Sequence, residues 1–270
     1  DFSTFDYVYY FAFGENRGIG AANNYGLKLA KKDGYDWCVT LDQDSLPPDD
    51  FCQKIAALIA FNLPDVGIIA PLYKSSENER DVRISSGYKY VNEVISSGCC
   101  INLKAFEAVG YQKEDFFIDC VDFEFCWNLR VHGYKIVQLQ SVILEHSLGN
   151  NGREINLFGR HLAYVTNHPP LRKYYMARNS LYLAKMYKDV FPKEVKQRKS
   201  KICKLLVKSI FFENNKIKSL KAICLGVRDY LNNKKGICMY QNLTENIRGG
   251  VQKYSTFAIR IYSTSERRAA

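Results

Sequence analysis

The stretch DWCVTLDQD, residues 36–44, decides the fold. Residues 37–41 are apolar or β-branched, which predicts that residues 36–41 form a buried strand that ends at Asp42. Asp42 and Asp44 then stand just past a strand end, where open α/β sheets bind their ligands. Two carboxylates at this spacing can both turn toward a cleft, and Mg²⁺ takes such oxygen ligands. Taken alone the pair is a weak signal, because acidic turn residues that cap a following helix are common.

The pattern around this stretch predicts alternating strands and helices. We expect a strand over residues 8–13, a loop over 14–20, helices over 21–32 and 47–62, and a strand over 66–70. Strands that alternate with helices in this order predict an α/β fold with a mostly parallel sheet flanked by helices.

Later segments predict further strands and then a change of character. We expect short β stretches within residues 73–94, a tight strand or turn over 95–102, helices over 104–109 and 121–132, and strands over 134–139 and 142–145. Residues 150–168 are polar and predict loops, followed by helices over 171–187, 201–212 and 217–231. The last two are basic and amphipathic, so we expect an α/β domain over residues 1–150 and a helical extension over 151–270.

The charge of the chain is concentrated in its last quarter. Residues 196–270 hold 17 Lys and Arg and 4 Asp and Glu, out of 38 and 28 in the whole chain, so the remainder carries 21 and 24. A near-neutral body with a basic tail predicts that the tail meets an anionic surface, either membrane phospholipid or nucleic acid. A solvated helical face is the ordinary alternative, and no motif supports nucleic-acid binding.

The cysteines indicate a reducing compartment. There are nine, an odd number, and the close pair Cys99 and Cys100 is adjacent in sequence, with no Cys-x-x-Cys. We expect reduced thiols in a cytoplasmic protein. No secretory leader pattern and no apolar run long enough for a membrane span is present.

Two later residues have chemistry that suits an active site. Asp122 stands at the start of the helix expected over residues 121–132, where the helix dipole favours a carboxylate. It is either a simple helix cap or a general base near an acceptor hydroxyl. His146 follows a predicted strand. A lone histidine there is usually structural, but beside carboxylates its nitrogen completes a divalent-metal site.

The order and spacing of these features resemble the family 2 glycosyltransferases with the GT-A fold, in particular their rhamnosyltransferase branch. The resemblance rests on the segments NRGIGAANNYG (16–26), LDQDS (41–45), VDFEFC (121–126), HGYKI (132–136), EHS (145–147) and YYMARN (174–179). It covers about residues 8–185 and implies that residues 1–150 are a GT-A catalytic domain whose first strand is missing. Val121 stands where most of the family has a glutamate.

The resemblance also implies a role for each candidate residue. It makes Asp122 the catalytic base. It implies that Asp44 binds Mg²⁺ or Mn²⁺, that Asp42 binds this metal or the donor ribose, and that His146 contacts the metal or the diphosphate. It also implies that the donor is bound by Asn16, Arg17, Gly18, Asn24, Gly98 and Arg178. Of these, Gly98 would line the donor-sugar and acceptor cleft, and Arg178 would hold the diphosphate.

The expected function is an inverting transfer of a sugar, rhamnose by subgroup, from a nucleotide-diphosphate donor. The acceptor would be a bacterial cell-surface polysaccharide or a lipid-linked saccharide. The basic helices within residues 196–270 either contact the inner face of the membrane peripherally or pack on the catalytic domain or on a second copy in a homodimer.

Some of these features also fit two other functions. The missing strand and Val121 favour a non-catalytic relative that binds a nucleotide sugar or glycan. A Rossmann dehydrogenase, prompted by Gly18-x-Gly20, would need glycine at position 23, where the chain has Asn23.

Overall fold

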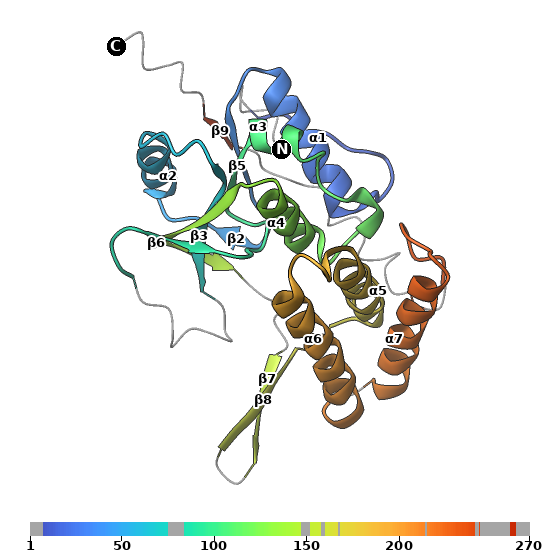
Figure 1. The fold of residues 1–270 in the computed structure, drawn as a ribbon. Coiled ribbons are helices and arrows are strands. Elements are labelled where there is room, and N and C mark those ends of the chain that lie inside the picture. The colour runs from blue at the N-terminus through green and yellow to red at the C-terminus, as the bar shows by residue number, and fades with distance from the viewer. Residues whose placement is uncertain are drawn as a thin grey trace.

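The computed structural model describes residues 8–74, 84–146, 152–157, 160–166, 168–213, 215–240, 243 and 260–262. Figure 1 shows the elements, which are, in chain order, α1 (Gly18–Lys32), β1 (Trp37–Thr40), β2 (Ser45–Leu46), α2 (Phe51–Ile59), β3 (Val66–Lys74), β4 (Tyr88–Val91), β5 (Cys99–Asn102), α3 (Leu103–Ala108), the 3₁₀ turn η1 (Glu114–Phe116), α4 (Val121–Val131), β6 (Lys135–His146), β7 (Gly152–Leu157), β8 (Arg160–Thr166), α5 (Pro170–Tyr187), α6 (Pro192–Phe211), α7 (Lys216–Leu231) and β9 (Arg260–Tyr262).

The central sheet is mixed, where the sequence predicted mostly parallel pairing. Its strands lie in the order β2-β6-β3-β5-β1-β9, with β4 also paired to β6. β3 and β6 are parallel, but β5 lies antiparallel between β3 and β1. A parallel neighbour needs a crossover connection, and the described residues between β3 and β5 contain β4 and no helix. The predicted α/β class with helices on the sheet is confirmed.

The strands alternate between two apolar cores. Cys38 and Ile68 face one core, and their neighbours Val39 and Ile69 face the other. Helices α1, α3 and α4 cover the first face and α2 covers the second, as Figure 1 shows. This two-sided burial holds the ends of β1 and β5, and the loops that follow them, in fixed positions.

Residues 8–13 do not form the predicted strand. The ring of Phe11 stacks on Tyr25 of α1 with 3.9 Å between centroids, and Phe13 meets the same ring edge-on at 5.5 Å. The aromatic residues that predicted a strand therefore pack on a helix instead. Among the described residues, β1 pairs with β5 on one side and β9 on the other.

The loops predicted over residues 150–168 are also wrong, because β7 and β8 form an antiparallel hairpin there. Residues 162–165 are a short hydrophobic run that includes Tyr164 and Val165, a strand signal that the polar flanks outweighed. Residues 135–146 form one strand where two were predicted.

The helical extension packs on the α/β part rather than beside it. Tyr182 and Leu183 of α5 and Val195 of α6 belong to the same apolar core as α1 and α4. α5 also packs against α7 through Tyr174, Tyr175 and Ala222. In the part of the chain that the structure describes, no helix combines the length and the hydropathy that a membrane span requires.

Candidate active site

The Asp-Gln-Asp loop runs from the end of β1 into β2. β2 pairs antiparallel with the end of β6, so that Ser45 lies opposite His146. Asp42 is half-buried, and its backbone N–H donates to Ser97 Oγ at 3.1 Å. Ser45 Oγ lies 2.6 Å from the same hydroxyl oxygen. The pairing brings the backbone of His146 beside exposed Asp44, although the structure does not describe the His146 side chain.

Gly98 connects this loop to β5. Its N–H donates to Thr40 O at 2.7 Å, and its φ of +74° is one that side chains disfavour. A Cβ atom here would come within 2.8 Å of Leu144 and 2.9 Å of Pro71. The position therefore requires glycine both for its backbone and for its contacts.

Asp122 lies in the first turn of α4, as predicted, with its side chain half-buried. Its Oδ1 accepts a hydrogen bond from the N–H of Phe123 at 2.9 Å. Burial raises the pKa of this carboxyl to about 7, while the Arg198 guanidinium lowers it and Asp119 raises it. At neutral pH the group therefore exists in both protonation states, which suits a proton acceptor.

The side chain of Cys99 links Asp122 to the acidic loop. Burial is the main cause that raises the pKa of its thiol to about 12, and the carboxylates of Asp122 and Asp42 raise it further. Both carboxylates thus lie near the first residue of β5. Asp122 and Asp42 therefore both lie near the Cys99 thiol, at the edge of the sheet where β5 begins.

The start of α1 meets the same edge. Asn16 Oδ1 accepts from the N–H of Gly18 at 2.9 Å, and the N–H of Ile19 donates to Phe117 O at 2.8 Å. Gly18 has a φ of +82°, and a Cβ atom there would lie 2.4 Å from that same carbonyl oxygen. Gly18 therefore lets α1 approach the turn that precedes Asp122.

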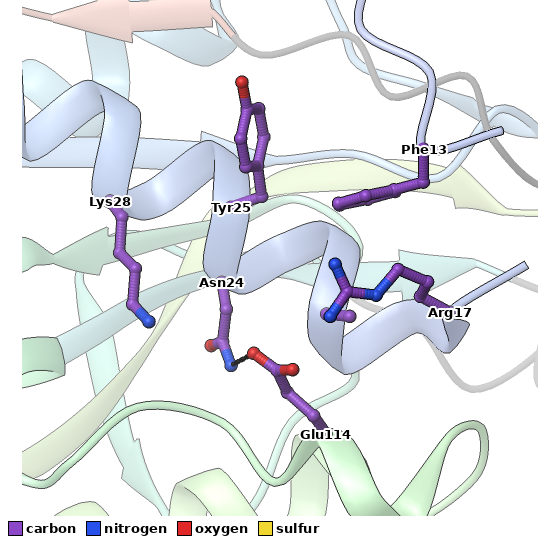
Figure 2. A pocket seen from close by; sticks show the side chains of 7 residues that line it. Phe13, Arg17, Asn24, Tyr25, Lys28 and Glu114 are labelled. Atoms are coloured by element: carbon purple, nitrogen blue, oxygen red, sulfur yellow. Dashed lines mark hydrogen bonds between the residues drawn. The ribbon is translucent and has the colours of Figure 1, made fainter. Parts of the chain in front are cut away.

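A small pocket opens on the outer side of α1, lined by Phe13, Arg17, Ala21, Asn24, Tyr25, Lys28 and Glu114. Figure 2 shows Arg17 beside Phe13, with 5.2 Å from its guanidinium carbon to the ring centroid. Asn24 donates to Glu114 Oε1 and to Gln112 O, both at 2.9 Å. The Asn24 amide thus anchors the 112–114 segment to α1, beside two cations and two aromatic rings.

The predicted diphosphate contact of Arg178 is wrong. Its side chain is 0% exposed. Its five N–H groups, the full set that arginine has, point to Asn179 Oδ1, Tyr174 Oη and the carbonyls of Gly236, Asp115 and Phe116, at 2.8–3.4 Å. No donor is left for a phosphate, so Arg178 is a structural residue.

The donor set fits a hard divalent cation only in part. Asp42 and Asp44 supply oxygen ligands, which Mg²⁺ and Mn²⁺ prefer, and the backbone pairing places His146 next to them. Within the described side chains, no group of three or more His, Cys, Asp or Glu is arranged to hold a metal. Asp42 and Asp44 are thus the two residues of a candidate metal site whose side chains the structure describes.

Sequence reasoning missed Arg198. It lies in α6, in the extension, yet it donates to Glu93 at 2.7 Å and its guanidinium carbon lies 3.6 Å from the centroid of the Phe123 ring, next to Asp122. The sequence contains one signal for this role, because α6 has six lysines and a single arginine. Arginine is favoured over lysine where a buried cation stacks on an aromatic ring and pairs with a carboxylate.

Comparisons with known proteins agree with the resemblance. The family described as glycosyl transferase family 2 matches residues 4–122. A dTDP-rhamnosyl transferase, RfbF of Shigella flexneri, is 25% identical over 190 residues, covering 65% of this chain and 62% of that protein. The match therefore spans less than two thirds of the relative. The predicted resemblance, including its rhamnosyltransferase branch, is confirmed.

Two solved structures are similar to this chain at low identity. TarS of S. aureus gives a TM-score of 0.46 at 13% identity, covering 90% of this chain and 42% of TarS. GalNAc-T7, solved with UDP, GalNAc and Mn²⁺, gives 0.47 at 12% identity, covering 91% and 46%. Likenesses this distant assign neither a ligand nor the role of a residue.

Proposed function

We propose that the protein moves a sugar from a nucleotide-diphosphate donor to an acceptor hydroxyl, inverting the anomeric configuration, because residues 4–122 match the glycosyl transferase family 2. One observation carries the proposal. Asp122 and Asp42 both act on the Cys99 thiol, which places a proton acceptor and one carboxylate of the Asp-Gln-Asp loop near the start of β5. A transferase needs both groups at one reaction centre.

In this mechanism Asp122 removes the proton of the acceptor hydroxyl. A carboxyl with a pKa of about 7 is a better base at neutral pH than an ordinary aspartate, whose pKa is about 3.9. Attack from the Asp122 side, opposite the leaving diphosphate, inverts the anomeric carbon. Such base catalysis is worth roughly 10²–10⁴-fold in rate.

The other half of the site faces the leaving group. Asp42, Asp44 and His146 would hold Mg²⁺ or Mn²⁺, which supplies charge neutralisation for a departing diphosphate. Asn16, Arg17 and Gly18 lie where α1 meets the turn before Asp122, which supports a role for them near the nucleotide. Asn24 contributes by holding Glu114 in place, and Gly98 lets the turn before β5 pack closely on Leu144 and Pro71.

dTDP-rhamnose is the first donor to test, because the relative from Shigella flexneri is described as a dTDP-rhamnosyl transferase. Release of dTDP is measured with Mn²⁺ for the wild type and for Asp122→Asn. We expect the variant to lose about 10²–10⁴-fold in turnover while binding dTDP as tightly as the wild type. Full turnover by Asp122→Asn rules out the base assignment. A wild type that binds intact donor and never releases dTDP is instead a binding protein.

We also propose that the extension rests on an anionic membrane surface. Among the described residues of α6 and α7, the exposed charged side chains are all cationic: Lys193, Lys196, Lys199, Lys201, Lys204, Lys216, Lys218, Lys221 and Arg228. The acidic residues of these helices face inward, since Glu194 pairs with Arg130 and Asp229 accepts from Tyr174. Phe211 and Ile217, at the turn between the helices, are 65% and 83% exposed. Cations around exposed apolar side chains suit a phospholipid interface.

Vesicle binding tests this contact without disturbing the fold. The triple variant K196Q, K199Q and K204Q is compared with K32Q, K89Q and K104Q, which removes equal charge elsewhere on the surface. On phosphatidylglycerol vesicles the first variant should lose about fivefold in partitioning per lysine, since each contributes about 1 kcal/mol. Equal losses in both variants would indicate general charge attraction and no docking face.

A further inference from the structure

The turn that leads into α4 uses backbone conformations that L-residues disfavour. Phe117, Asp119 and Cys120 have φ values of 66°, 62° and 65°, and none is a glycine. Each carries a steric penalty that the surroundings must offset. Cys120 directly precedes α4, so this turn sets the direction from which Asp122 enters the site.

Asn179 of α5 holds the turn. Its Nδ2 donates to the carbonyl oxygens of Phe116, Ile118 and Asp119 at 2.8, 2.7 and 3.0 Å. The side chain is 0% exposed, so water does not compete for these bonds. An amide suits the position because it donates two hydrogens from one nitrogen, which three carbonyls share.

Arg178 fixes the orientation of this amide. Its Nε donates to Asn179 Oδ1 at 3.0 Å, which leaves Nδ2 facing the turn. Its Nη2 reaches the carbonyls of Asp115 and Phe116 at 3.4 and 3.3 Å. Two adjacent residues of α5, about 60 positions further along the chain, therefore donate hydrogen bonds to the backbone carbonyls of the segment just before Asp122.

We infer that Asn179 is a positioning residue for Asp122, acting through the 116–120 turn. It keeps the turn in its left-handed form, and the turn keeps the carboxylate half-buried beside Cys99. The catalytic meaning of this arrangement rests on the proposed function, whereas the hold on the turn is a property of the geometry alone. The helical extension is on this view a part of the catalytic machinery.

The surroundings of Asp122 provide a readout for its position. Charged or titratable groups face it from each neighbouring element: Arg198 from α6, Asp119 and Cys120 from the turn, Cys126 from α4, Cys99 from β5 and Tyr73 from β3. Burial is the main cause of its raised pKa. If the turn relaxes, the carboxylate gains water and its pKa falls toward the ordinary value of about 3.9.

The experiment compares Asn179→Ala with a matched control, Tyr175→Phe. Tyr175 also lies on α5 and uses its hydroxyl in one buried hydrogen bond, accepted from the N–H of Cys238 at 2.7 Å. That bond does not involve the turn. Two readouts are taken from the full chain: the Asp122 carboxyl titration, by ¹³C NMR with Asp122→Asn for assignment, and turnover of dTDP-rhamnose.

For Asn179→Ala we expect the Asp122 titration to move from about 7 toward about 4, with kcat reduced at least tenfold and KM within twofold. The low-pH limb of the activity profile should move with the titration. Tyr175→Phe should lower the melting temperature and leave both readouts unchanged. An Asn179→Ala protein that titrates and turns over like Tyr175→Phe overturns the inference.

Two further outcomes are separated by the design. If the wild type turns over no donor, the proposed function fails while the carboxyl titration still decides the role of Asn179. If Asn179→Ala does not fold, Asn179→Ser keeps one donor and should show an intermediate titration shift. A folded serine variant that titrates as the wild type does contradicts the inference.

Discussion

Among the described residues, buried charged groups are paired within the helices α5 to α7, whereas the buried carboxylate at the edge of the sheet is not. In the helices, Lys173 pairs with Glu213, at side-chain exposures of 2% and 3%, and every donor of Arg178 is bonded. At the sheet edge, Asp122 is desolvated and forms no ion pair within the described residues. Paired charges stabilise a fold, whereas a desolvated carboxylate outside an ion pair is ready to exchange a proton.

Removing one partner of the Lys173–Glu213 pair should have the largest effect on stability. Glu213→Ala leaves a buried ammonium unpaired, which costs about 3–5 kcal/mol of unfolding free energy. Urea unfolding measures the loss. The double variant Lys173→Met with Glu213→Leu is the control and should recover most of it. A loss below about 1 kcal/mol in the single variant would show that the pair behaves as a surface pair.

Glu124 provides a pH test of a carboxyl that is buried without an ion pair. It is 0% exposed, and burial raises its pKa to about 7 although the Tyr187 hydroxyl lowers it. Because the folded pKa lies above the unfolded one, its stabilising contribution is present below about pH 4.3 and is lost as pH rises to about 7. Glu124→Gln should therefore be about 3–4 kcal/mol more stable than wild type at pH 8 and equal to it at pH 4. Thermal denaturation at both pH values measures this difference. Equal melting temperatures of the wild type and the variant at pH 8 would contradict the raised pKa of Glu124.

Gly98→Ala tests how closely the sheet edge is packed. Positive φ costs about 1–3 kcal/mol for a side chain, and the new Cβ also meets Leu144 at 2.8 Å. Gly34→Ala is the matched control, because Gly34 has a φ of +88° with open space around it. Only Gly98→Ala should also reduce kcat. Equal effects of both variants on stability and turnover would show that the contact between the new Cβ and Leu144 has no effect beyond that of the positive φ.

The smallest expected effect is a shift of the pH profile in Arg198→Gln. Arg198 lowers the pKa of Asp122, so its removal should raise the midpoint of the activity profile above about 7, by about one pH unit. Arg130→Gln breaks another pair that joins α4 to α6, with Glu194, and is the control. Its midpoint should not move. A midpoint that stays near 7 in Arg198→Gln as well would show that burial alone sets the pKa.

The acidic part of the site was predictable because it depends on local pattern. Asp42 and Asp44 follow an apolar strand and Asp122 starts a helix, features that neighbouring residues specify. The same reasoning failed for residues 8–13, whose aromatic side chains have a strand pattern but pack on Tyr25. Local propensity was there overruled by a contact with a helix.

The supporting part of the site depends on contacts between distant segments, so the sequence does not reveal it. Arg178 was assigned to a phosphate from its motif, and only its bonds to Gly236 and to η1 show a structural role. Arg198 stands among lysines on a helix that looks solvated, yet it reaches Phe123 and Glu93. Burial and long-range partners decide such roles, and neither follows from spacing along the chain.

Paramagnetic NMR with Mn²⁺ and dTDP tests most directly whether the acidic loop and Asp122 share one reaction centre. If Asp42 and Asp44 hold the ion, its unpaired electrons should broaden the backbone amide signals of Cys99 and Phe123, and Asp44→Ala should abolish the broadening. Sharp Cys99 and Phe123 signals, together with Asp44-dependent broadening elsewhere in the chain, would contradict the shared site.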